Sequence, residues 1–125
     1  MEFLSAEWAD ALKERLNDND AFRQAAANQH ATIQQVITRD GGETRYWIRI
    51  DDGSIDLGVG DAVQPDATIT QSYETAVALT KGELSPVTAF MSGKIKIAGN
   101  MGMLLGLQGA LAQLPGSMSS LDVSY

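Results

Sequence analysis

The sequence has no cysteine and one histidine among its 125 residues. Without thiols there can be no disulfide bond, no cysteine nucleophile and no thiolate zinc site. His30 lies between a predicted helix and a predicted strand, and no G-x-S-x-G or comparable nucleophile motif accompanies it. We therefore interpret His30 as a surface residue, and the chain offers little support for a catalytic triad.

Positive charge is also scarce, with 9 Lys plus Arg against 16 Asp plus Glu and a net charge of −7. No basic cluster is denser than Lys94 and Lys96. Attraction to phosphates dominates nucleic-acid affinity, and basic clusters drive binding to anionic lipid surfaces. We therefore expect no nucleic-acid partner, and at most transient, apolar contact with a membrane.

Motifs for cofactors and metals are missing as well. Neither G-x-x-x-x-G-K-[ST] nor G-x-G-x-x-G occurs. Asp51, Asp52 and Asp56 do not follow the alternating calcium-loop pattern, and they fall where a hairpin turn is expected. The sequence therefore predicts no cofactor, no metal and no catalytic residue, and we expect a protein that is not an enzyme.

Charge is unevenly distributed along the chain. Residues 1–66 carry 13 acidic and 6 basic residues, whereas residues 67–125 carry three of each. No charged residue occurs in the 25 residues from Ile97 to Leu121. Polar residues, glycines and Pro115 interrupt that segment, so we do not interpret it as a membrane span. The first residues lack the basic and apolar regions of a signal peptide, and we expect a cytoplasmic protein.

Hydrophobic periodicity predicts a single α+β domain over residues 1–125. Helices are expected at about 6–16 and 21–28, the first capped by Ser5 and the second by Asp20. Alternating residues predict three hairpin-linked strands at 32–38, 44–50 and 54–59. A strand at 67–70, a helix at 73–80, a helical turn from Pro86, a strand at 94–98 and a helix at 101–114 complete the chain. The order predicts a mostly antiparallel sheet with helices on one face.

The last predicted helix is apolar nearly all round. One stripe holds Met103, Leu107, Ala110 and Leu114, and a second holds Met101, Leu104, Leu105 and Leu111 with Gln108 among them. Such a helix is buried on both sides or shields an apolar object. A core helix or a dimer contact is the commoner case. The many Met and Gly residues favour an adaptable apolar pocket.

Several motifs in order resemble the lipid-binding domain of the sterol-carrier-protein-2 family. They are Asp66-Ala67-Thr68-Ile69-Thr70, Leu79 with Gly82, Pro86, Ala89-Phe90, Gly93-Lys94-Ile95-Lys96-Ile97, Gly99-Asn100-Met101-Gly102, Leu107-Gln108 and Pro115-Gly116. The resemblance spans about residues 30–116 and implies a five-stranded, largely antiparallel sheet covered by helices. It also implies an apolar tunnel between them for fatty acids, fatty acyl-CoA or sterols, bordered by the C-terminal helix.

From the apolar stripes and this resemblance we predict a ligand-binding wall that is apolar apart from one glutamine. Its residues are Leu79, Phe90, Ile95, Ile97, Met101, Met103, Leu104, Leu107, Gln108 and Leu111. The favoured hypothesis is a non-catalytic carrier of a lipid or another apolar small molecule.

Two other functions stay open. In the first, the C-terminal helix pairs with a second copy, forming a homodimer, or with a lipid-metabolising enzyme, so that the chain is an interaction module or accessory subunit. In the second, the fold is recruited for catalysis on an apolar substrate through a carboxylate such as Asp51 or Glu74. The alternation of side chains along the strands places no acidic residue on the predicted inner face. The catalytic function therefore ranks below the interaction module.

Overall fold

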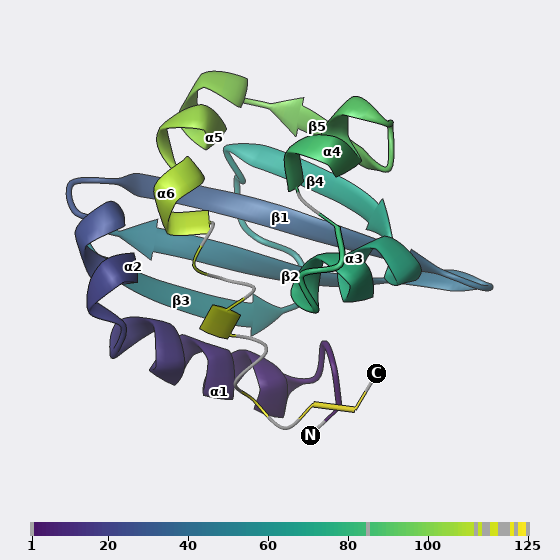
Figure 1. Ribbon diagram of the computed structural model, residues 1–125, viewed down its shortest axis with the longest axis horizontal. Helices are drawn as coiled ribbons and strands as arrows, with labels where there is room; N and C mark the ends of the chain where they lie inside the picture. The colour runs from purple at the N-terminus through teal and green to yellow at the C-terminus, as the bar shows by residue number, and fades with distance from the viewer. Residues whose placement is uncertain are drawn as a thin grey trace.

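The computed structural model describes residues 2–84, 86–111, 113, 116–117, 121 and 123–124. Five strands and six helices are described in this part of the chain (Figure 1). They are α1 (Ala6–Asn17), α2 (Asp20–Ala25), β1 (His30–Arg39), β2 (Gly42–Asp51), β3 (Ser54–Val59), β4 (Ala67–Ser72), α3 (Tyr73–Thr80), α4 (Pro86–Met91), β5 (Ile95–Gly99), α5 (Met101–Gly106) and α6 (Gln108–Leu111).

The strands form one sheet in the order β3-β2-β1-β4-β5. β1, β2 and β3 are joined as antiparallel hairpins, and β4 pairs with β5 in the same manner. β1 and β4 are parallel neighbours, with Ile33 opposite Ala67. The predicted α+β class and the five-stranded, mostly antiparallel sheet are confirmed.

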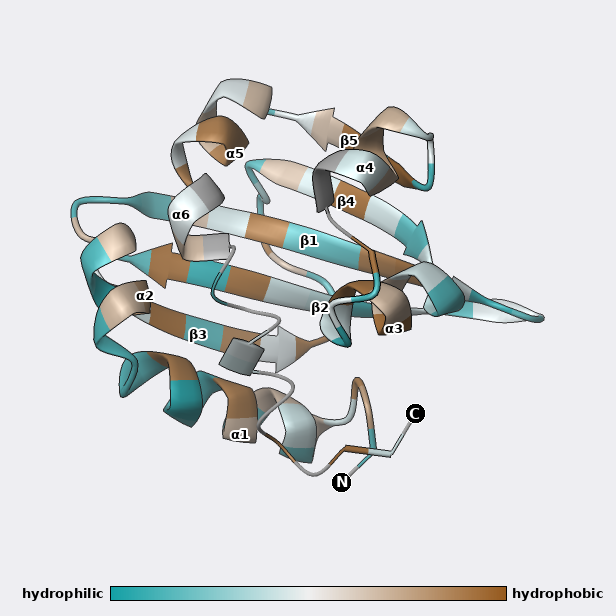
Figure 2. Ribbon diagram, viewed as in Figure 1, coloured by the Kyte–Doolittle hydropathy of each residue, from teal (hydrophilic) through white to brown (hydrophobic). Residues whose placement is uncertain are grey.

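Helices cover one face of the sheet, which we call the inner face (Figure 1). Hydrophobic and hydrophilic residues alternate along β2 and β3, as a sheet covered on one side requires (Figure 2). The alternation and the cross-strand register place these residues on the inner face: Ala31, Ile33, Gln35, Ile37, Tyr46, Ile48, Ile50, Ile55, Leu57, Val59, Ala67, Ile69, Gln71, Ile95 and Ile97. None of these is charged; Arg39, which continues the same phase at the end of β1, is exposed.

The first helix follows its sequence pattern closely. Ser5 accepts a hydrogen bond from the amide of Trp8, which caps α1 as predicted. Trp8, Leu12 and Leu16 are fully buried, because their spacing of four places them on one side of the helix. The second helix is shorter than predicted. Asn19 rather than Asp20 caps it, because the Asn19 side chain accepts from the amide of Phe22.

The single helix predicted over residues 101–114 is wrong. The chain instead forms α5 and α6, with Leu107 in the turn between them. The amide of Leu107 donates to the carbonyls of both Met103 and Leu104. Gly102, Gly106 and Gly109 weaken a continuous helix, since each glycine costs about 1 kcal/mol relative to alanine.

Of the two alternatives for this apolar segment, burial on both sides does not hold for its described residues. Leu104, Leu107 and Ala110 are buried, whereas Leu105 remains 63% exposed. No helix in the described residues is both long enough and apolar enough to span a bilayer.

Candidate functional site

Five of the predicted wall residues lie where the sheet meets its helices. Ile95 and Ile97 belong to the inner face of β5, Ile95 buried and Ile97 half-buried. Leu104 and Leu107 are part of the hydrophobic core, and Met103 packs against it. Leu79 of α3 is half-buried as well. The strand end, α5 and the turn after it therefore contribute to one apolar layer.

Other predicted wall residues are more open. Phe90 on α4 is 44% exposed, and Met101 at the start of α5 is 38% exposed. The side chains of Gln108 and Leu111 lie outside the described part of the structure. The neighbouring Met91 is also exposed, so α4 and α5 both carry apolar side chains toward solvent.

Two buried glutamines that the sequence analysis did not select lie on the inner face. Gln35 of β1 and Gln71 of β4 are 6% and 9% exposed. The Nε2 of Gln71 lies 3.4 Å from the Oε1 of Gln35, to which it donates a hydrogen bond. The sequence contains a signal for these two positions. Side chains alternate between the two faces of a strand, and each glutamine lies two residues after an inward isoleucine, Ile33 in β1 and Ile69 in β4.

Two more polar groups in this layer are uncharged. Tyr46 pairs with Gln35 across the hairpin, and burial raises the pKa of its hydroxyl well above its usual range. The Trp8 ring meets the Tyr46 ring edge-on, with centroids 5.2 Å apart. The indole Nε1 of Trp8 is buried and has no hydrogen-bond partner among the described residues. The inner face thus combines apolar side chains with a few neutral polar groups.

The acidic residues considered for chemistry lie elsewhere. Asp51 is exposed and pairs with His30, Oδ1 to Nδ1 at 2.9 Å, and Glu74 is exposed on α3. Asp52 sits in the hairpin turn with a φ of 45°. Across the described residues, no group of three or more His, Asp or Glu side chains is placed to hold a metal ion.

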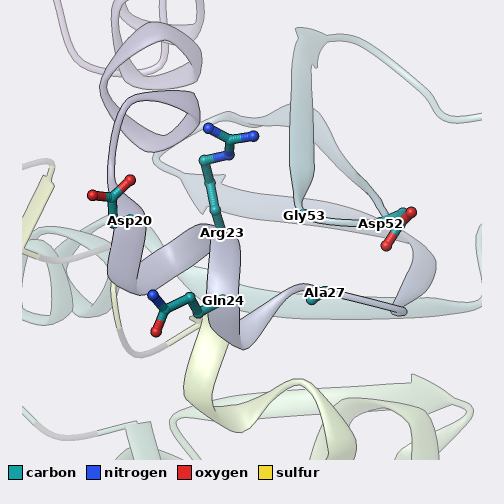
Figure 3. A pocket seen from close by; sticks show the side chains of 6 residues that line it. All are labelled: Asp20, Arg23, Gln24, Ala27, Asp52 and Gly53. Atoms are coloured by element: carbon teal, nitrogen blue, oxygen red, sulfur yellow. The ribbon is translucent and has the colours of Figure 1, made fainter.

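Two surface depressions, of about 350 and 360 Å³, lie away from the predicted wall. The first is lined by Asp20, Arg23, Gln24, Ala27, Asp52 and Gly53. In Figure 3 its charged side chains point in different directions rather than toward a common centre. The second lies beside Arg15 and Asp18. Neither depression is formed by the inner face of the sheet.

With this geometry in view, comparison with known proteins identifies the family. The model of the SCP-2 sterol transfer family matches residues 9–112, most of the chain. The chain belongs to the SCP-2 sterol transfer family.

Individual relatives agree with this assignment. Sterol carrier protein 2 of Gallus gallus is 39% identical over 69 residues, which are 54% of this chain and 13% of that protein. The matched segment therefore spans about an eighth of the length of that relative. Among solved structures, the crystal structure of sterol carrier protein 2 matches with a TM-score of 0.83 and 21% identity, over 96% of this chain and 99% of the other.

A third similar protein is described as palmitated. The solution NMR structure of palmitated SCP2L2 from Aedes aegypti matches with a TM-score of 0.63 and 22% identity, over 92% of this chain and 95% of that one. At this level of identity the two structural matches show a shared fold.

The structure also explains part of the SCP-2 motif from Asp66 to Asn100. Gly99 has a φ of 109°, and a Cβ there would lie 2.6 Å from the carbonyl oxygen of Asp66. The amide of Asn100 donates to that same carbonyl at 3.0 Å, and its Oδ1 accepts from Met103, capping α5. The Asp66 carboxylate accepts from the amide of Thr32 at 2.8 Å. These motif residues thus tie β1, β4, β5 and α5 together.

Proposed function

We propose that this SCP-2 family chain binds and carries a lipid, a fatty acid, fatty acyl-CoA or sterol, in an apolar tunnel between the sheet and helices α3 to α6. It is a non-catalytic carrier in this proposal. The observation that carries the proposal is the buried part of the inner face, which is largely apolar, carries no charged side chain and is bordered by Leu104 and Leu107 from the C-terminal segment. The name of the palmitated relative supports an acyl chain as one ligand.

Hydrocarbon burial supplies most of the binding free energy in this proposal. Each buried methylene contributes about 0.8 kcal/mol, so an acyl chain of about 16 carbons gains on the order of 10 kcal/mol before ordering costs. A single neutral hydrogen bond adds about 1 kcal/mol. Affinity therefore depends mainly on the shape and volume of the apolar space, and polar contacts set the orientation of the ligand.

Two adjacent leucines of α5 give a matched test. Leu104 is buried and Leu105 is 63% exposed, so Leu104→Trp fills the space beside the sheet while Leu105→Trp places the same ring in solvent. Titration with a fluorescent fatty acid is expected to show at least a tenfold loss of affinity in Leu104→Trp and less than a threefold change in Leu105→Trp. Circular dichroism checks that both variants fold. Equal affinities in two folded variants would contradict the proposed wall.

A second candidate is an interaction module or accessory domain of a lipid-metabolising enzyme. The exposed apolar side chains of Phe90, Met91 and Leu105 favour it, as does the small share of the chicken relative that the chain covers. Native mass spectrometry after gentle purification separates the two proposals. A bound lipid mass supports the carrier, and an empty homodimer supports the module. The cytoplasmic location and the extent of the domain over residues 1–125 stay predictions from the sequence.

A further inference from the structure

The buried pair Gln35 and Gln71 on the inner face destabilises the fold unless a further group forms a hydrogen bond with it. Gln71 is 9% exposed, its Nε2 donates to Gln35, and its Oε1 has no hydrogen-bond partner within the described residues. A buried amide oxygen without a partner destabilises the fold, because it gives up the hydrogen bonds that it makes to water in the unfolded chain. Two methionines of similar volume would fill the same positions without that cost, so the pair calls for a reason other than packing.

The surroundings of the pair are apolar. Gln71 lies opposite Ile37 on β1 and opposite Ile95 on β5, and Gln35 lies opposite Ile69. Arg39, the next inward-phase residue of β1, is exposed and lies over the ring of Tyr73, 4.1 Å from its centroid. Because the Arg39 guanidinium is held over Tyr73 at the exposed end of β1, a carboxylate or phosphate buried beside Gln71 would lose its hydration, which is far more costly than burying a neutral group. A neutral group therefore completes the pair at lower cost than an anion does.

A hydroxyl group meets this requirement in either orientation of the two amides. In the orientation described, the free atom of Gln71 is an oxygen that needs a donor. If both amides are rotated, the hydrogen bond between them is kept and the free atom of Gln71 is a nitrogen that needs an acceptor. Because a hydroxyl both donates and accepts, it satisfies Gln71 in both cases.

We propose that Gln35 and Gln71 form an internal recognition point for the hydroxyl group of a neutral long-chain lipid whose hydrocarbon lies along the inner face. The inference rests on the proposed lipid-binding function and narrows its ligand class to lipids with a buried hydroxyl. Gln71 makes the hydrogen bond, and Gln35 positions the Gln71 amide from the neighbouring strand.

The first measurement asks whether the pair serves the fold. The double variant Gln35→Met, Gln71→Met removes both amides and keeps the side-chain volumes close to the original. Thermal unfolding without ligand is expected to show a melting temperature equal to or above that of the unchanged protein, because the unpartnered group is gone. A lower melting temperature assigns the pair a structural role and overturns the proposal.

The second measurement compares two lipids that differ by one hydroxyl, 1-hexadecanol and hexadecane, as competitors of a bound fluorescent fatty acid. The unchanged protein is expected to bind 1-hexadecanol about tenfold more tightly than hexadecane, the equivalent of 1.4 kcal/mol. In the single variant Gln71→Met the preference is expected to fall below threefold. Gln24→Met makes the same substitution at an exposed site of α2 and is expected to keep the tenfold preference.

The outcomes distinguish the two proposals. Binding of both competitors without preference, or a preference that Gln71→Met leaves unchanged, overturns the recognition point and leaves the lipid-carrier function standing. If the fluorescent fatty acid and both competitors fail to bind, the carrier function falls, and the recognition point falls with it. Gln35→Met provides a second variant, in which a weakened preference supports the positioning role of Gln35.

Discussion

The side-chain amide of Asn17, the last residue of α1, pairs with both backbone polar atoms of Ile55 on the edge strand β3. Its Nδ2 donates to the Ile55 carbonyl at 3.0 Å, and its Oδ1 accepts from the Ile55 amide at 2.9 Å. The Asn17 side chain thus forms the two hydrogen bonds that a neighbouring strand would form with Ile55 at this edge of the sheet. An unpaired edge is a place where other chains can add, so this contact both fixes α1 and covers part of the edge.

Replacing Asn17 by alanine removes both hydrogen bonds and leaves the Ile55 groups to water. We expect Asn17→Ala to lower the free energy of unfolding by about 1–3 kcal/mol, since each bond contributes about 0.5–1.5 kcal/mol. Urea denaturation followed by circular dichroism measures this. The neighbouring exposed Asp18 gives the control, because Asp18→Ala is expected to change stability by less than about 0.5 kcal/mol. Equal effects in the two variants would contradict the role of the Asn17 contact.

Gly99 is expected to tolerate no side chain. Its φ of 109° disfavours other residues, and an added Cβ would lie 2.6 Å from the Asp66 oxygen and 2.8 Å from the Cα of Ala67. Gly60 has a similar φ of 115° but nothing within 4 Å of an added Cβ. Gly60→Ala therefore measures backbone strain alone, and Gly99→Ala measures strain plus steric conflict.

We expect Gly99→Ala to be less stable than Gly60→Ala by more than about 1 kcal/mol, as is usual where backbone must shift to relieve a clash. Chemical denaturation of both variants tests this. If the two alanines have the same effect, the close approach of Gly99 to Asp66 does not matter to stability.

Burial of Tyr46 predicts a loss of stability in alkali. The pKa of its hydroxyl is raised in the folded protein, so its contribution is complete below the ordinary value of about 10 and falls as the pH rises above it. In that range the unfolded chain releases the proton and the folded protein keeps it. Each pH unit then costs up to about 1.4 kcal/mol of stability.

The phenylalanine variant isolates this effect. Urea denaturation at pH 9, 10 and 11 is expected to show a steeper decline for the unchanged protein than for Tyr46→Phe, which lacks the titrating hydroxyl. Other groups titrate equally in both proteins, so only the difference between the two slopes matters. Parallel slopes would show that Tyr46 ionises as easily in the folded protein as in the unfolded chain.

Much of the fold follows from local sequence patterns. The period of four in Trp8, Leu12 and Leu16 predicts the buried side of α1, and alternation predicts β3 at its observed bounds. The motifs from Asp66 to Asn100 predict the family, because their turn and strand residues occur in a specific order and spacing. The break at Leu107 was missed, since an uncharged apolar run gives a strong helical period even where glycines make two short helices the better solution.

The candidate site was predictable in part, for the same reason. Apolar residues of β5 and α5 were found from their periodicity, but periodicity alone does not tell the buried Leu104 from the exposed Leu105. That difference depends on where α5 docks. The Gln35 and Gln71 pair was missed because the sequence does not show which residues are neighbours on adjacent strands. A polar residue at an inward position can be assigned a role only when its neighbour on the next strand is known.

By itself, the sequence determined that thiol chemistry is absent, where most of the strands and helices lie, and the family to which the chain belongs. Composition and short-range spacing are sufficient for these. The tertiary structure decided that β1 and β4 lie side by side in parallel, which brings together Gln35 and Gln71 from positions 36 residues apart. It also decided that Asn17 meets Ile55 across 38 residues. Such contacts depend on long-range pairing, where the free energy is set by the packing of whole elements rather than by any local pattern.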